Sequence, residues 1–177
     1  ETEKTAGMIP SWGQILTRIP RLESGAWQAM GGLKRWLVAT RSAVLIMTLI
    51  SAGLGIAFAA ELGPVDWLNS ALALLGLTLA HATNNLLNDY TDSRRGIDKD
   101  NYYRNQYGVH VLEDGLMSER QFWRYLGATA AIALVLGGWL IAQRSGLTLN
   151  LMLAGAFFVL FYTWPLKYYG LGEPAVL

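Results

Sequence analysis

Side chains that could bind a metal ion gather in one stretch of the sequence, residues 81–98 (HATNNLLNDYTDSRRGID). Carboxylate and carboxamide oxygens dominate this stretch, and such hard ligands suit Mg²⁺, which binds a few carboxylates together with substrate phosphates. At about 100° per residue of helix, four of the polar side chains fall within about 60° of one another. These four are His81, Asn85, Asn88 and Asp92. The spacing predicts one polar stripe on a helix.

The residues that we expect to ligate Mg²⁺ are the acids and the last asparagine of this stretch: Asn88, Asp89, Asp92 and Asp98. Basic residues follow directly and could hold phosphate charge through charge-assisted hydrogen bonds. They are Arg94, Arg95, Lys99 and Arg104. Asn85, one turn deeper, is a candidate contact for phosphate or metal. The stretch therefore predicts a metal–diphosphate clamp with Asn85 and Arg104 as substrate-binding residues.

Simpler interpretations remain for the same residues. Asp and Asn favour helix ends, so the stretch could merely end a helix and begin a solvated loop. Asn85 could form a helix–helix hydrogen bond, His81 could be a packed polar residue, and Arg104 could be a solvated loop arginine. The stripe and the adjoining basic residues favour the clamp.

The elements that must position this stripe are apolar and long. The chain is 53% hydrophobic and 15% charged, whereas soluble domains carry about a quarter charged residues. Four apolar stretches, at residues 42–60, 65–88, 125–142 and 147–162, approach or reach the roughly 20 residues of helix that cross a bilayer. We predict an all-α, multi-pass transmembrane helical bundle with about four spanning helices. Residues 42–177 would form this part, and the polar stripe would end its second span.

Basic residues predict the orientation of the bundle. Six precede the first apolar stretch and six lie between the second and the third, whereas residues 61–66 contain none. Positive charge collects on the cytoplasmic side of a membrane, so the N-terminus and the long loop should be cytoplasmic. Residues 1–41 would form a cytoplasmic leader, either with an interfacial helix or only partly ordered. The net charge of +1 gives no reason to expect a nucleic-acid partner.

Three segments resemble a known family. Residues 88–98 (NDYTDSRRGID) resemble the first aspartate-rich motif of the UbiA superfamily of membrane prenyltransferases. The form of the motif is closest to the branch that prenylates 1,4-dihydroxy-2-naphthoate in menaquinone synthesis. Residues 112–118 (LEDGLMS) and 162–173 (YTWPLKYYGLGE) resemble two further elements of the family. Order and spacing agree over residues 41–177.

The resemblance implies what the chain would do. The fold would have roughly nine helices in an inner membrane, and Mg²⁺ with basic residues would draw diphosphate from a polyprenyl diphosphate. The resulting cation would be attacked by an aromatic quinone precursor, with the metal stabilising the leaving group. Lys167 and Tyr162, in the third of these segments, are expected to bind substrate; their alternatives are snorkelling of the lysine to the interface and an interfacial aromatic belt.

Two other functional classes are compatible with a polar cluster in a membrane helix. A cation-coupled transporter or channel could bind its ion there. Broken helices in the middle of the membrane would favour it, but the acids lie at a helix end beside a basic loop. A non-catalytic scaffold subunit is the third class, and it gives the polar stripe no purpose.

The family has a second aspartate-rich motif in its C-terminal half, and residues 1–177 contain none. We therefore expect this chain to be the N-terminal part of a longer protein and, alone, to be inactive, because it would hold half of the metal site. The measurement is prenyl transfer by purified residues 1–177 in detergent. Turnover by this piece would contradict the expectation.

Overall fold

The computed structural model describes residues 7–95, 108–144 and 146–170, and all regular structure among them is helical. Four long helices make up most of it: α4 (Ser42–Leu62), α5 (Trp67–Arg94), α7 (Glu119–Gln143) and α8 (Leu147–Phe161). Two short irregular helices follow α8, η2 (Tyr162–Leu166) and η3 (Lys167–Tyr169). The expected all-α class is confirmed for the described residues.

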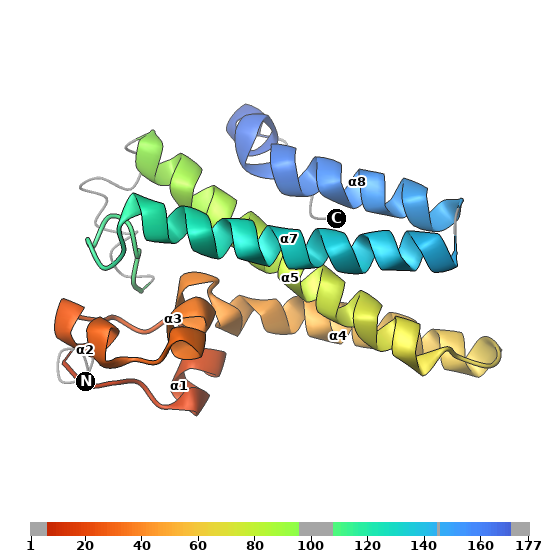
Figure 1. The fold of residues 1–177 in the computed structure, drawn as a ribbon, viewed down its shortest axis with the longest axis horizontal. Helices are drawn as coiled ribbons and strands as arrows, with labels where there is room; N and C mark the ends of the chain where they lie inside the picture. The colour runs from red at the N-terminus through yellow and green to blue at the C-terminus, as the bar shows by residue number, and fades with distance from the viewer. Residues whose placement is uncertain (1–6, 96–107, 145, 171–177) are drawn as a thin grey trace.

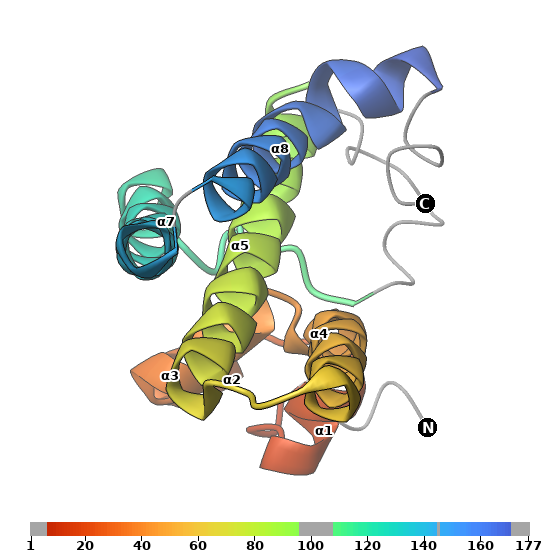
Figure 2. The ribbon, with the colours of Figure 1, turned by 90° about the vertical axis from the view of Figure 1, so that its right-hand side faces the viewer.

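The long helices alternate in direction, and α5 lies between its neighbours. It packs against α4 on one side and against α7 and α8 on the other (Figure 2). The start of α4, the end of α5, the start of α7 and the end of α8 lie at the same end of the bundle, on the left in Figure 1. The loop that leads into α7 lies there too, so the polar end of α5 is surrounded by elements from the whole chain.

Local sequence explains where α5 and α7 begin. The Asp66 side chain accepts a hydrogen bond from the Asn69 amide at the start of α5, and the Ser118 hydroxyl accepts one from the Gln121 amide at the start of α7. The Gln121 side chain returns a bond to the Ser118 amide, which completes a capping box. These caps satisfy donors that have no partner within the helix.

Among the described residues, two helices, α4 and α7, are long and apolar enough to cross a membrane, and α8 is a shorter apolar helix. Their outward faces carry large exposed apolar side chains, such as Leu54, Phe58 and Val135, which suit contact with lipid. Helix α5 is the longest of the four, but its polar residues lower its mean hydropathy. The predicted count of about four spanning helices is therefore not confirmed.

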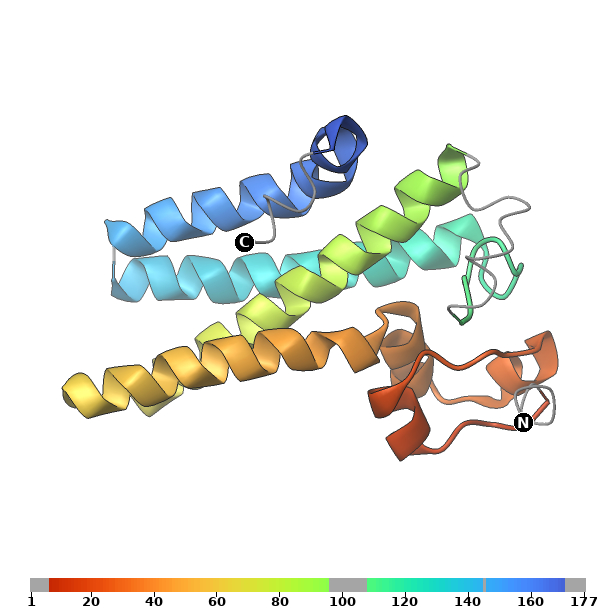
Figure 3. The ribbon, with the colours of Figure 1, turned by 180° about the vertical axis from the view of Figure 1, so that it is seen from behind.

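The leader folds into three short helices, α1 (Trp12–Thr17), α2 (Ser24–Ala29) and α3 (Gly32–Ala39), beneath the polar end of the bundle (Figure 3). Its apolar side chains enter the main core together with residues of α5, the 108–118 loop and α7. Ile15 and Trp27 are buried there beside Leu86 and Phe122. The core thus fastens the leader to the end of α5.

Gly108 joins the loop to the leader. Its φ of +103° is a conformation that L side chains rarely adopt, and a Cβ there would lie 2.6 Å from the backbone oxygen of Ile19. The next amide, of Val109, donates to the Pro20 oxygen at 3.1 Å. We expect Gly108→Ala to destabilise the protein by about 2 kcal/mol or more, through backbone strain and the clash. Thermal unfolding in detergent, followed by tryptophan fluorescence, measures this.

Gly138→Ala is the control. Gly138 lies within α7, and a Cβ there would meet no atom within 4 Å, so alanine should keep or slightly raise the midpoint. Equal midpoints for the two variants would show that the loop does not approach Ile19 as described.

Candidate functional site

The last two turns of α5 carry the polar residues predicted from the sequence, and two of them point at one lysine. The Lys167 ammonium lies 3.2 Å from Asn88 Oδ1 and 3.0 Å from Asp92 Oδ2. Asn88 and Asp92 are four residues apart, so both occupy one face of the helix. The Asp92 side chain is 4% exposed and that of Lys167 is 41% exposed. These two side chains of α5, the oxygen pair Asn88 and Asp92, therefore both bind the ammonium of Lys167, which lies in the segment after α8.

The chain after α8 turns so that Lys167 reaches α5. Trp164 interrupts the helix with extended backbone angles (φ −138°, ψ 125°), and Pro165 follows it. Proline has no amide hydrogen to continue a helix. Lys167 then begins η3, which ends at Gly170 in the left-handed conformation. The kink at Trp164 brings the residues after it back toward the end of α5.

Arg95 holds the two segments together. Its guanidinium carbon lies 3.8 Å from the ring centre of Trp164 and 4.4 Å from that of Tyr168. The two rings also touch edge to face, with centres 5.3 Å apart. Arginine stacks on aromatic rings through cation–π attraction. Since Lys167 lies between Trp164 and Tyr168 in sequence, this clamp fixes the backbone that carries its ammonium.

A second pair of predicted residues faces a different neighbour. The Asp89 carboxylate forms an ion pair with Arg41 at the junction of α3 and α4, and its side chain is 2% exposed. Asn85, one turn earlier, donates from Nδ2 to the Thr40 backbone oxygen at 2.9 Å. The single stripe expected from the sequence is therefore two adjacent faces: Asn88 and Asp92 toward Lys167, and Asn85 and Asp89 toward the leader junction.

His81 lies deeper in α5 and hydrogen-bonds the Thr48 hydroxyl of α4 through Nδ1, at 2.7 Å. This contact is a hydrogen bond between two helices, which is the packed polar role that the sequence left open for His81. Tyr162 begins η2, near the same helix end, and is half-buried. Its backbone amide donates to the Phe158 oxygen, and its own backbone oxygen accepts from the Lys167 amide.

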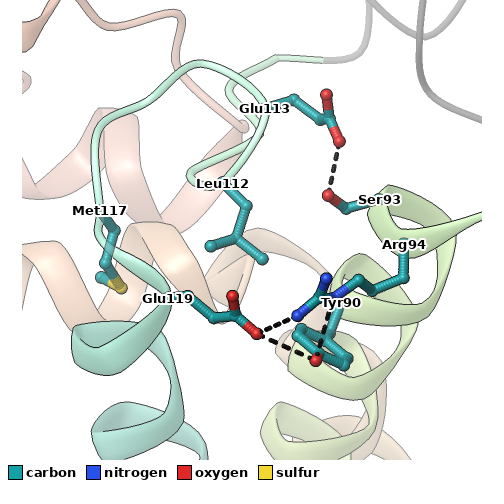
Figure 4. Close-up of a pocket in the computed structure, with 7 residues that line it drawn as sticks. All are labelled: Tyr90, Ser93, Arg94, Leu112, Glu113, Met117 and Glu119. Carbon is teal, nitrogen blue, oxygen red and sulfur yellow. Dashed lines mark hydrogen bonds and ion pairs between the residues drawn. The ribbon is translucent and has the colours of Figure 1, made fainter. Parts of the chain in front are cut away.

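The outer side of the α5 end carries an open pocket (Figure 4). Arg94 donates to Glu119 at the start of α7 and to the hydroxyl of Tyr90, and that hydroxyl donates to Glu119 at 3.1 Å. Ser93 donates to Glu113 of the loop. These exposed bonds tie α5 to the loop and to α7. Arg94, which the sequence offered as a phosphate ligand, is engaged here with a carboxylate.

Among the predicted residues the structure thus brings together Asn88, Asp92 and Lys167, while Asp89 and Asn85 contact the leader junction. Asp98 and Arg104 lie outside the described residues. Arg41 and Trp164 were not singled out from the sequence. The sequence offered one indication for each: Arg41 directly precedes an apolar span, and Trp164 directly precedes a proline.

The oxygen pair has the chemistry of a site for a hard cation. Asn88 Oδ1 and the Asp92 carboxylate already converge on one positive group, and Asp92 Oδ1 is buried with no hydrogen-bond partner in the described part of the chain. A buried carboxylate oxygen without a hydrogen bond is open to a further ligand. Within the same described part, no three His, Cys, Asp or Glu side chains cluster as a metal site. The pair fits a metal held partly by other oxygens, such as phosphate.

Comparison with known proteins identifies the family of this chain. The profile of the UbiA prenyltransferase family matches residues 44–177, which is most of the chain. No curated protein and no solved structure matches it. Members of this family are integral membrane proteins that act on prenyl diphosphates and generally use divalent metal ions. Nothing favours the transporter or channel class. The match includes α5, η2 and the oxygen pair, and the chain therefore belongs to the UbiA prenyltransferase family.

Proposed function

We propose that the chain, as part of its full protein, transfers a polyprenyl group from its diphosphate to an aromatic acceptor at the cytoplasmic face of an inner membrane. The observation that carries this is the convergence of Asn88 and Asp92 on the Lys167 ammonium. Two oxygen ligands and a lysine at one helix end form a place where a metal and a phosphate can be neighbours.

The roles follow from the chemistry of each side chain. Asn88 and Asp92 would hold Mg²⁺ through their oxygens, and Lys167 would bind the diphosphate as a compact positive charge. When bound, the metal would stabilise the negative charge that develops on the leaving diphosphate. Asp89, Asp98, Asn85, Arg104 and Tyr162 stay predictions as ligands of metal or substrate. The carboxylate of Asp89 already has Arg41 as a partner, so its own contribution would be smaller than that of Asp92.

The proposed acceptor is 1,4-dihydroxy-2-naphthoate, and the support for it is the form of the motif at residues 88–98. Its electron-rich ring could attack a prenyl cation, and the apolar helices would keep water from that cation. An assay with this naphthoate and with 4-hydroxybenzoate, each with one polyprenyl diphosphate, tests the choice. Turnover of the benzoate alone would overturn the acceptor and leave the family unaffected.

Asp92→Asn in the full-length protein should lower kcat/KM by about 100-fold or more, because the metal supplies several kcal/mol of transition-state stabilisation. The substitution keeps the shape of the side chain and removes its charge. Prenyl transfer in detergent, measured over a range of Mg²⁺ concentrations, gives both the rate and the metal dependence.

Glu61→Gln makes the same chemical change at the end of α4 farthest from the site. It should leave the rate and the metal dependence unchanged. Full activity in Asp92→Asn would rule out the assigned role of Asp92.

The proposed orientation has its own test, because residues 1–177 contain no cysteine. A cysteine at position 120, on the side of the leader, should react with a membrane-impermeant maleimide only after the cells are permeabilised. A cysteine at position 61, at the other end of α4, should react in intact cells. The variants are Arg120→Cys and Glu61→Cys, both at exposed positions.

The parent protein, treated in the same way, reports any labelling elsewhere in the full sequence. The opposite pattern, with position 120 labelled in intact cells, would invert the orientation and leave the chemistry of the site untouched.

A further inference from the structure

Lys167 and a metal ion would need the same two side chains, and both cations would use the single side-chain oxygen of Asn88. The ammonium bonds to Asn88 Oδ1 and Asp92 Oδ2 at hydrogen-bond distance, and Asn88 and Asp92 are the side chains that the proposed function assigns to the metal. An ammonium and a divalent ion bound to the same two side chains would lie close together, and their charges would repel. We propose that Lys167 is a tethered counter-ion that competes with the divalent metal for Asn88 and Asp92, and that metal binding releases it toward the diphosphate.

The burial of Asp92 is the first reason. Its side chain is 4% exposed, and a buried carboxylate without a positive partner is strongly destabilising. Lys167 supplies that partner from a segment 75 residues away in sequence. The tethered ammonium is the positive partner of this carboxylate, and an incoming metal would have to displace it from Asn88 and Asp92.

The form of the lysine is the second reason. Its side chain is 41% exposed, and the four-carbon stem lets the ammonium move while the backbone stays in place. The backbone is held by the clamp that Trp164 and Tyr168 form around Arg95. Lys167 can therefore leave the oxygens without leaving the site, and the released ammonium stays within reach of a phosphate bound there.

The inference rests on the proposed function, since Asn88 and Asp92 must be metal ligands for any competition to occur. The measurement is the dissociation constant of Mn²⁺, a paramagnetic substitute for Mg²⁺, from the full-length protein in detergent. Electron paramagnetic resonance counts free Mn²⁺ directly, and neither substrate nor turnover is needed.

Removal of the competitor should tighten metal binding. We expect Lys167→Met to lower the dissociation constant of Mn²⁺ about three- to tenfold, as the loss of one partly exposed ion pair and of its repulsion predicts. Lys167→Arg keeps the charge and should bind Mn²⁺ like the parent. Arg144→Met removes one positive charge at the far end of α7, where Arg144 is exposed, and should change nothing.

The variant Asp92→Asn distinguishes failure of the counter-ion proposal from failure of the proposed metal site. Loss of Mn²⁺ binding in Asp92→Asn together with unchanged or weaker binding in Lys167→Met would overturn the counter-ion and keep the metal site. Unchanged Mn²⁺ binding in Asp92→Asn, or no binding by the parent, would overturn both. Thermal unfolding checks each variant, and Lys167→Gln replaces Lys167→Met if the latter does not fold; the same tightening is then required of it.

Discussion

A carboxylate that is almost completely buried at the end of a helix requires a positive partner, and α5 carries two such carboxylates. Asp89 pairs with Arg41 from the junction before α4, and Asp92 pairs with Lys167 from the segment after α8. The cost of an unpaired buried charge is several kcal/mol, so each pairing constrains where a distant part of the chain can lie. The arrangement around the motif follows from these two requirements.

The two pairings give the end of α5 two different sides. The side toward Arg41 is closed by the leader and its apolar core, with Asn85 bonded to the Thr40 backbone. The side toward Lys167 has a partly exposed cation and a carboxylate oxygen without a hydrogen-bond partner in the described residues. The second side therefore combines an exposed cation with an open carboxylate oxygen, which is what the proposed site for metal and phosphate requires.

Much of this could be read from the sequence, and the rest required contacts between distant segments. Apolar length predicted the all-α class and the bounds of α4 and α8 within two residues, because hydrophobic run length depends on local composition. Helix α5 ends and helix α7 begins six residues beyond the apolar stretches, where the helices are polar. Helical spacing placed Asn88 and Asp92 on one face. Spacing could not show that Asn85 and Asp89 face a different neighbour, because that depends on which segments pack against α5. The roles of Arg41 and Trp164 likewise depend on chain positions far from the motif, and periodicity carries no information about such pairings.

Arg41 adopts the left-handed conformation, with φ of 55°, at the point where the leader turns into the first long helix. Its guanidinium reaches Asp89 from this turn, so detachment of the leader would leave a buried carboxylate without this partner. Ordering of the leader and completion of the motif are therefore coupled through this ion pair. During synthesis the leader emerges first, yet it gains its ionic partner only after α5 has been made, 48 residues farther along the chain.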